Sequence, residues 1–395
     1  MNIISSVQSD LAELTRIRRD IHAHPELGYT EERTASMIAQ LLRDAGLEVH
    51  TGIGKTGVVG VLKKGSGARS IGLRADMDAL PIQELNQFAH ASRHEGVMHA
   101  CGHDGHSAML LGAARYLARE GHYDGTVHFV FQPAEESGAG AKAMIEDGLF
   151  ERFPMQAIFG MHNRSGLPVG KFGVNEGAVM ASSCTFRVVV QGRGGHGGRP
   201  QLCVDPVPPT CEIVLGIQSI VARNLDPHDP GVVSVTRLRA GEANNVIPDH
   251  TEFSGTIRIF SAATLELIER RIKAIAGHVA AAHDCECEVS FERGYPATIN
   301  DPEAARLARR VMRDIVGDEH VLALPPLTGS EDFAFYQQRI PGAYVFIGNG
   351  CGDHREPDHG AGPCVTHNAS YDFNDGIIPL GATYWARLAE AYLSV

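Results

Sequence analysis

Two kinds of apolar pattern alternate along the first 180 residues. Apolar residues at helical spacing predict two helices within 10–45, with a turn at 24–28 between them. Helices are also expected at 107–119 and 139–147. Short runs rich in β-branched or aromatic residues predict strands at 57–62, 70–74, 126–131, 157–161 and 343–347. Strands that alternate with helices predict an α/β domain, with a mostly parallel sheet flanked by helices.

The pattern changes near residue 180 and changes back after residue 294. Strands are expected at 186–191, 231–238, 252–259 and 286–291, and helices at about 211–224 and 263–283. That order, β-α-β-β-α-β, is typical of a ferredoxin-like α+β unit. We therefore expect one α/β domain made of residues 1–180 and 295–395, interrupted by a smaller domain inserted at 181–294.

Composition and charge exclude several classes of protein. The 395 residues are 43% hydrophobic and 21% charged, which excludes a disordered or fibrous chain. A formal net charge of −12 disfavours nucleic acid and anionic membrane surfaces as partners, and no apolar run approaches the length of a membrane span. The first ten residues do not resemble a signal peptide, and eight cysteines in so long a chain are not a disulfide framework. A cytoplasmic location is therefore expected.

Ionisable side chains gather where the predicted strands end. The strand at 70–74 runs into Asp76 and Asp78, the strand at 126–131 into Glu135 and Glu136, and the strand at 157–161 into His162. In open α/β sheets, ligands bind outside the carboxyl ends of the strands. One carboxylate in such a place is often only a solvated loop residue, but three charged strand ends in succession predict a binding site.

A glycine-flanked loop between these strands adds metal-ligand chemistry. Cys101 and His103 lie two residues apart in the segment M-H-A-C-G-H-D-G-H at 98–106. Together with Glu136, His162 and a late histidine, for which we choose His367, they supply borderline ligands for Zn²⁺, Mn²⁺, Co²⁺ or Ni²⁺. Twenty histidines will also cluster by accident, but the first four residues all fall on predicted strand ends or the glycine loop.

The adjacent pair Glu135 and Glu136 predicts the reaction. If the pair lies on extended backbone, its two side chains point to opposite sides. One carboxylate can then bind a metal ion while the other reaches the water that the ion binds. Metal coordination lowers the pKa of that water to about 7, and an unligated carboxylate can pass its proton to a leaving amine. This pair therefore predicts the hydrolysis of an amide.

Six sequence blocks together resemble one enzyme family. The blocks are R-A-D-M-D-A-L-P at 74–81, M-H-A-C-G-H-D-G-H at 98–106, Q-P-A-E-E at 132–136, N-V-I-P-D at 245–249, S-E-D-F-A-F at 330–335 and Y-D-F-N-D at 371–375. In this order, over essentially the whole chain, they resemble the M20 metallopeptidases, in the subgroup of hippurate hydrolases and N-acyl-amino-acid amidohydrolases.

The resemblance implies a dinuclear centre, with two divalent metal ions per subunit. Its implied ligands are Cys101, His103, Glu136, His162 and His367, with Glu135 as general base and acid. It also implies that the inserted domain at 181–294 is a lid through which members commonly dimerise, so a homodimer or a higher homo-oligomer is expected.

The resemblance gives roles to three residues of the lid and also shows departures. His196 matches a histidine that stabilises the tetrahedral oxyanion, and Asn245 with Arg258, thirteen residues later, matches a pair that binds the substrate carboxylate. Four positions depart from the family pattern: Arg164, Arg199, Gln201 and Ala369. Two extra cations near the cleft, Arg164 and Arg199, could favour substrates with acidic groups.

These observations predict a metal-dependent amidohydrolase that cleaves N-acyl-L-amino acids such as hippurate, with metal-bound water activated by Glu135. One alternative is a sister reaction of the same family: a peptidase, a carbamoyl-amino-acid hydrolase, or a hydrolase of an acylated metabolite. A second alternative is a binding or regulatory protein without activity. An intact Glu135 beside Glu136 argues against it, because a pure binding site needs no base.

Overall fold

The computed structural model of the chain describes residues 1–136, 138–355 and 358–394. It contains two compact units. Unit 1 comprises Met1–Gly177, Ile299–Pro325 and Asp332–Val395, and unit 2 comprises Ala178–Thr298 and Pro326–Glu331. The apolar pattern did not predict that the short segment 326–331 would join unit 2.

Unit 1 is built on an eight-stranded sheet in the order β1-β2-β4-β3-β5-β16-β6-β15. The four central strands β4, β3, β5 and β16 are parallel, whereas β1, β2 and β6 join them as antiparallel neighbours. The strands are β1 (Glu48–Ile53), β2 (Gly57–Lys64), β3 (Ser70–Asp76), β4 (Gly125–Gln132), β5 (Ala157–Ser165), β6 (Phe172–Gly173), β15 (Val321–Leu322) and β16 (Gly342–Gly350). The parallel centre brings the carboxyl ends of β3, β4 and β5 to one edge.

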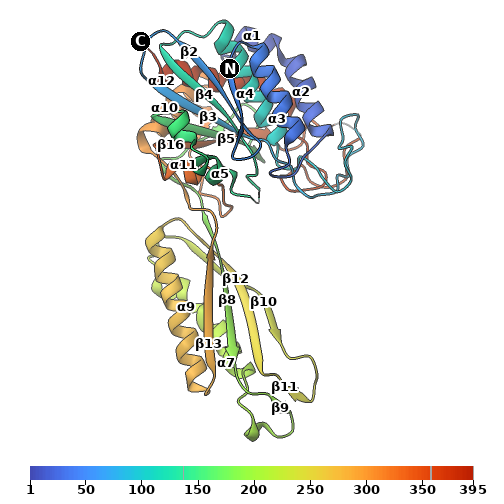
Figure 1. Cartoon of the computed structure of the whole chain (residues 1–395), viewed down its shortest axis with the longest axis vertical. Helices are drawn as coiled ribbons and strands as arrows, with labels where there is room; N and C mark the ends of the chain where they lie inside the picture. The colour runs from blue at the N-terminus through green and yellow to red at the C-terminus, as the bar shows by residue number, and fades with distance from the viewer. Residues whose placement is uncertain (137, 356–357, 395) are drawn as a thin grey trace. The chain divides into compact units, whose positions relative to one another are not determined.

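Helices flank this sheet, as Figure 1 shows. They are α1 (Ser5–Ser9), α2 (Leu11–Ala23), α3 (Glu32–Asp44), α4 (His103–Arg119), α5 (Gly140–Glu146), α6 (Leu149–Arg152), α10 (Pro302–Val316), α11 (Ala334–Gln337) and α12 (Ile378–Tyr392). Helices α4 and α12 are the most deeply buried: Met109 and Trp385 are almost completely inaccessible. Burying such apolar faces is the dominant favourable term in folding, so this core holds the sheet edge in place.

Unit 2 has the ferredoxin-like arrangement. Its antiparallel sheet has the order β10-β12-β8-β13, and the two longest helices pack on it through one apolar cluster that includes Ile213 and Ile268. The elements are β8 (Ser182–Gln191), β9 (Gly195–His196), α7 (Val207–Ile217), α8 (Ser219–Asn224), β10 (Gly231–Ala240), β11 (Val246–Ile247), β12 (His250–Ile259), α9 (Ala262–Ala282) and β13 (Glu286–Arg293). Two further strands, β7 (Gly177–Met180) and β14 (Thr298–Asn300), pair with each other.

The predicted fold class is confirmed, with local differences. The helix expected at 211–224 is two helices, and the first begins at Val207 although Pro206, Pro208 and Pro209 surround its start. Proline is tolerated there because the first turn has no intrahelical partner for its N–H groups. Strand β1 was not predicted, since it is an edge strand with a mostly exposed, polar sequence.

Candidate metal centre

The candidate centre lies at the carboxyl edge of the parallel strands of unit 1. Strand β3 ends at Asp76, β4 ends three residues before Glu135, and His162 lies near the end of β5. Asp76 and Gln132 are directly paired across β3 and β4, so the loops that follow them start side by side. Ligand sites in open α/β sheets occupy this edge.

The loop that carries Cys101 and His103 is shaped by Gly102. This residue has a φ of 92°, in the left-handed region, and it caps the N-terminus of α4. A Cβ atom at this position would lie 2.3 Å from Oδ1 of Asn163 and 2.6 Å from the hydroxyl of Tyr371. Only glycine fits there. It lets the chain turn sharply, so that the sulfur and the imidazole on either side of it both reach the strand edge.

The structure brings all five predicted ligands together. Two groups of three have ligand atoms within 4.8 Å of one another: Cys101, His103 and His162 form the first group, and Cys101, Glu136 and His367 form the second. Sγ of Cys101 lies 3.3 Å from Nε2 of His162, and Nε2 of His367 lies 3.3 Å from Oε1 of Glu136. Two sets of donors that share one thiol fit two neighbouring ions better than one.

The imidazole of His162 is prepared to act as a ligand. Its Nδ1–H donates to the carbonyl of Asn163 at 2.6 Å, which leaves the lone pair of Nε2 directed at Cys101. Burial lowers the pKa of His162 to about 3, so the ring stays neutral. A neutral imidazole with one nitrogen held by a hydrogen bond is the form that binds transition metals.

The charges around the predicted ligands also favour the binding of a cation. Burial, and after it the charges of Glu136 and Glu135, raises the pKa of the Cys101 thiol well above its usual value. Burial opposes the charge of His103, but Asp76, Asp78 and Glu136 together outweigh it and raise the pKa of that imidazole to about 10. The carboxylates raise both pKa values, so they make the local potential negative. A divalent cation would offset this potential and would favour the thiolate.

Two buried atoms point to the same conclusion. Nε2 of His103 and Oε1 of Glu136 are buried; the first has no hydrogen-bond partner among the residues that the structure describes, and the second has only the 3.3 Å contact with Nε2 of His367. They lie 3.8 Å apart, too far for a hydrogen bond. Buried polar atoms without partners are costly, and a bound ion is one of the usual reasons for them. The donor set therefore fits divalent metal ions.

Glu135 lies in the cluster, but not on the backbone that the sequence predicted. Strand β4 ends at Gln132, Ala134 has a φ of 50°, and Glu135 and Glu136 form a turn. The expected extended pair is therefore wrong. Glu135 is buried, with 6% of the residue exposed, and a carboxylate oxygen lies within 4.8 Å of ligand atoms of His103 and Glu136, so it still borders the centre.

Several positioning residues were not singled out by sequence. Asp78 accepts from Nδ1 of His103 at 3.2 Å and from the backbone N–H of Glu136 at 2.9 Å, so one carboxylate orients two predicted ligands. Behind them, His106 contacts Asp76 and the side-chain oxygen of Asn163, both at 2.6 Å. Asp76 and Asp78 were visible as charges at a strand end, but no sequence pattern marked Asn163.

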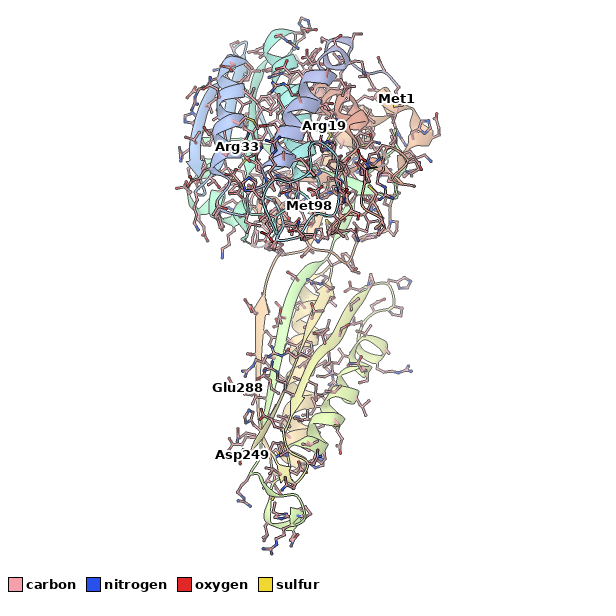
Figure 2. The ribbon with its side chains drawn as sticks, turned by 90° about the vertical axis from the view of Figure 1, so that its right-hand side faces the viewer. Met1, Arg19, Arg33, Met98, Asp249 and Glu288 are labelled. Carbon is pink, nitrogen blue, oxygen red and sulfur yellow. The ribbon has the colours of Figure 1, made fainter. Side chains whose placement is uncertain are left out.

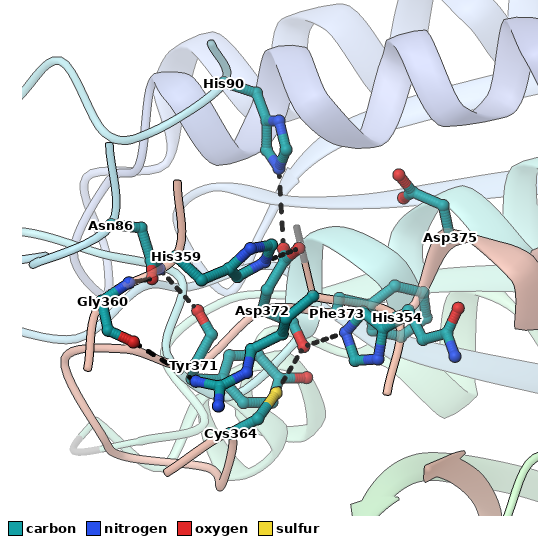
Figure 3. Close-up of polar contacts among 12 residues, drawn as sticks. Asn86, His90, His354, His359, Gly360, Cys364, Tyr371, Asp372, Phe373 and Asp375 are labelled. Atoms are coloured by element: carbon teal, nitrogen blue, oxygen red, sulfur yellow. Dashed lines mark hydrogen bonds and ion pairs between the residues drawn. The ribbon is translucent and has the colours of Figure 1, made fainter. Parts of the chain in front are cut away.

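The loop that carries His367 is held by a buried polar network around Asp372 (Figure 3). The carboxylate of Asp372 accepts from His359 at 3.0 Å and from Arg18 at 3.2 Å, and its backbone carbonyl accepts from His354 at 3.3 Å. His367 itself has a φ of 64°, and its N–H donates to the carbonyl of Ala100 at 2.7 Å. The late histidine is thereby fixed beside the loop of Cys101.

The other three predicted site residues belong to unit 2. His196 is exposed on β9, and its Nδ1 accepts from the N–H of Gly198 at 2.9 Å. That contact places the ring proton on Nε2, which is then a hydrogen-bond donor. The N–H of Gly197 donates to the carbonyl of Asn245 at 2.8 Å, so His196 and Asn245 are neighbours. They lie at the end of the unit that carries Asp249, labelled in Figure 2.

Unit 2 does not bring Arg258 to Asn245. Asn245 precedes β11, which lies near the start of β12, whereas Arg258 is the next-to-last residue of β12 and pairs with Ser183. Eight residues separate His250 from Arg258, which corresponds to roughly 26 Å at about 3.3 Å per residue. Nη1 of Arg258 is buried, without a hydrogen-bond partner in the described part of the chain. The thirteen-residue spacing therefore does not place Asn245 and Arg258 side by side within unit 2.

The departures from the family pattern occupy different places. Arg199 and Gln201 are exposed and follow His196 in unit 2, where the N–H of Arg199 donates to the carbonyl of His196. Ala369 lies in the loop of His367, and its carbonyl accepts from the N–H of Leu85. Arg164 is half-buried on β5, two residues beyond His162.

Comparisons with known proteins agree on one family. Residues 72–391 match the model of peptidase family M20/M25/M40. The sequence is 44% identical over 397 residues to hippurate hydrolase of Campylobacter jejuni, covering 100% of each chain. It is 38% identical to N-acetylcysteine deacetylase of Bacillus subtilis, covering 96% of this chain and 97% of that one. The crystal structure of a Bacillus subtilis protein described as a dinuclear metal-binding peptidase of the M20 family matches with a TM-score of 0.84 and 34% identity, covering 98% and 99% of the chains.

The chain therefore belongs to peptidase family M20/M25/M40, and it is a hydrolase that acts on amide bonds. This finding confirms the resemblance stated from the sequence blocks and excludes the alternative of a protein without activity. Within the described residues, no helix combines the length and the apolar character needed to cross a bilayer.

Proposed function

We propose that the protein hydrolyses the amide bond of N-acyl-L-amino acids of the hippurate type, with two divalent metal ions in unit 1. The observation that carries the proposal is the pair of donor groups that share Cys101, with the carboxylate of Glu135 beside them. The 44% identity to a hippurate hydrolase over the full length of both chains supports the choice of substrate.

The five ligands Cys101, His103, Glu136, His162 and His367 would hold the ions, which the donor chemistry restricts to Mn²⁺, Zn²⁺, Co²⁺ or Ni²⁺. Bound divalent cations supply Lewis acidity, which acidifies water and polarises a carbonyl. Asp78 keeps His103 and the backbone of Glu136 in place. Such supporting contacts commonly decide metal affinity.

Glu135 moves the proton in this proposal. Its carboxylate takes a proton from the attacking water. It then returns this proton to the nitrogen of the leaving amino acid, because a neutral amine is a far better leaving group than a deprotonated amine. The burial of Glu135 excludes bulk water from this exchange. The amide C–N bond breaks, and a carboxylic acid and an amino acid are released.

Three residues of unit 2 are proposed to act on the substrate. His196 donates from Nε2 to the oxyanion of the tetrahedral intermediate, a role that its Nδ1 contact with Gly198 supports. Arg258 binds the α-carboxylate of the substrate through a guanidinium whose buried Nη1 has no partner in the described structure. Asn245 lies at the other end of β12, so Asn245 and Arg258 serve one substrate only if they come from two copies of the chain. This geometry supports the homodimer that the sequence predicted.

The first prediction concerns the substrate carboxylate. Truncating one partner of a buried charge-assisted contact leaves the other unpaired and costs about 2–5 kcal/mol, or roughly 30-fold or more in kcat/KM. Wild type should therefore cleave hippurate at least about 30-fold better than hippuramide. Arg258→Ala should remove that preference. The measurement is kcat/KM for both enzymes on both substrates.

Arg187→Ala is the matched control, because Arg187 lies on β8 of the same sheet but is ion-paired with Glu252 at the surface. It should keep the preference for hippurate. Equal cleavage of hippurate and hippuramide by wild type would contradict carboxylate recognition, and an amide without that group would then be the better substrate.

A further inference from the structure

Arg164 lies on the same face of β5 as a predicted metal ligand. Side chains two residues apart on a strand point to the same side, so Arg164 and His162 share a face. On the neighbouring strand β16, Phe346 pairs with His162 and Gly348 pairs with Arg164. The backbone of Leu167 and Pro168 packs against this glycine, and the guanidinium carbon of Arg164 lies 5.4 Å from the centre of the Phe346 ring.

The charge of Arg164 has no counter-ion in the described structure. Its Nη1 is buried without a hydrogen-bond partner among the described residues, and none of the ion pairs found there includes it. Burial lowers the pKa of Arg164, but a guanidinium still stays charged at neutral pH. A half-buried cation without an anion is costly unless a ligand supplies the anion.

Two fully buried arginines of unit 1 show the contrast. Arg18 contacts the carboxylates of Asp372 and Asp375 at 3.2 and 2.6 Å. Arg74 contacts Asp76 at 2.6 Å and a second carboxylate at 3.1 Å. The two fully buried arginines thus receive carboxylates from the fold. Arg164 does not receive one, and its place beside the candidate centre indicates that its anion comes with the substrate.

The distance between Arg164 and His162 along β5 fits a particular class of substrate. Two residues along a strand span about 6.6 Å, so the guanidinium lies within a side-chain length of a substrate held at His162. Because the proposed function assigns the α-carboxylate to Arg258, Arg164 remains for a second anionic group. An acidic side chain of the amino acid and a carboxylate in the acyl group share this chemistry.

We propose that Arg164 is a specificity residue that binds a second carboxylate of the substrate, so that dicarboxylic N-acyl amino acids are preferred over neutral ones. This proposal rests on the proposed function for the reacting centre. It accounts for a cation at a position where the sequence departs from the family pattern. Arg199 is not needed for it, because that residue is exposed in unit 2.

The test compares pairs of substrates in which one member carries a second carboxylate and the other has a neutral group in its place. N-benzoyl-L-glutamate against N-benzoyl-L-glutamine tests a side-chain carboxylate, and N-succinylglycine against N-butyrylglycine tests an acyl carboxylate. One charge-assisted contact is expected to change kcat/KM by about 10- to 100-fold. Wild type should prefer the charged member of at least one pair by that factor. Arg164→Met should lose the preference while it keeps its rate on hippurate.

Two further variants separate specificity from stability. Arg164→Lys keeps the charge without the bidentate geometry and should retain part of the preference. Arg43→Met removes an exposed arginine of α3 and should change nothing. Binding of N-benzoyl-L-glutamate and N-benzoyl-L-glutamine to the Glu135→Gln variant, measured by calorimetry with and without Arg164→Met, gives a readout that does not need turnover.

Each outcome either supports or overturns the proposed role of Arg164. The charged ligand should bind about 10-fold or more tightly only when Arg164 is present. Equal kcat/KM and equal binding for both members of both pairs would overturn the proposal. So would an equal loss on hippurate and on the charged substrates in Arg164→Met, since that result indicates a general structural role. Absence of hydrolysis of every N-acyl amino acid, together with charge-selective binding, would refute the proposed function but not the role of Arg164.

Discussion

Glu135→Gln is expected to lower kcat by about 10²- to 10⁴-fold, the usual contribution of a general acid–base group. The amide keeps the shape of the side chain but cannot accept and return a proton. The five predicted ligands are unchanged, so the metal content of the variant should equal that of wild type. The measurements are kcat on hippurate and elemental analysis of the same preparations.

The matched control is Glu146→Gln, because Glu146 is an exposed residue near the end of α5 in the same unit. It should keep the activity of wild type. If Glu135→Gln retains activity within a few-fold, Glu135 is not the base. If instead the variant loses metal together with activity, Glu135 is a ligand and the roles of the pair with Glu136 must be exchanged.

Removal of divalent metal is expected to abolish turnover, and adding it back to restore turnover. Cys101 belongs to both donor groups, and its buried thiol is surrounded by carboxylates that disfavour the thiolate unless a cation is present. Cys101→Ala should therefore lower the metal content as well as the rate. Chelation followed by the separate addition of Mn²⁺, Zn²⁺, Co²⁺ and Ni²⁺ identifies which ion supports activity.

The control for this experiment is Cys351→Ala, which removes an exposed cysteine of unit 1 outside the cluster. It should bind metal and turn over like wild type. Full activity after exhaustive chelation, with metal absent by elemental analysis, would refute the metal-dependent mechanism.

The fold was predictable because its apolar patterns are regular. Strands such as β4 and β5 are buried on both faces, which produces the continuous apolar runs typical of a parallel sheet. In unit 2, β12 alternates between buried and less buried residues, as a strand with one covered face should. Short exposed strands such as β1 carry no such pattern, and a helix that begins among prolines looks like a loop.

That the five proposed ligands lie close together was predictable for a different reason. Parallel strands end at one edge, so residues at strand ends far apart in sequence meet there. That rule located Glu136 and His162, whereas His367 follows no described strand end and was chosen through its surroundings. Contacts that depend on one turn or rotamer could not be predicted. The turn at Glu135 and Glu136 is one example, and the contact of Asn163 with His106 is another.

Two residues of unit 2 show the limit of sequence spacing. Asn245 and Arg258 are thirteen residues apart, and the resemblance gave them one shared role. The chain turns once and then runs the full length of β12 between them, so the two residues lie at opposite ends of a sheet. Sequence distance therefore did not predict their separation.

The most direct test of the central claim is the product analysis of hippurate cleavage in H₂¹⁸O by the metal-reconstituted protein. The account predicts benzoate and glycine in equal amounts, with ¹⁸O in the benzoate, because water attacks the acyl carbon. The same protein after chelation should release neither product. Hippurate that remains intact with the metal-loaded protein, or benzoate that forms at the same rate without metal, would contradict the account.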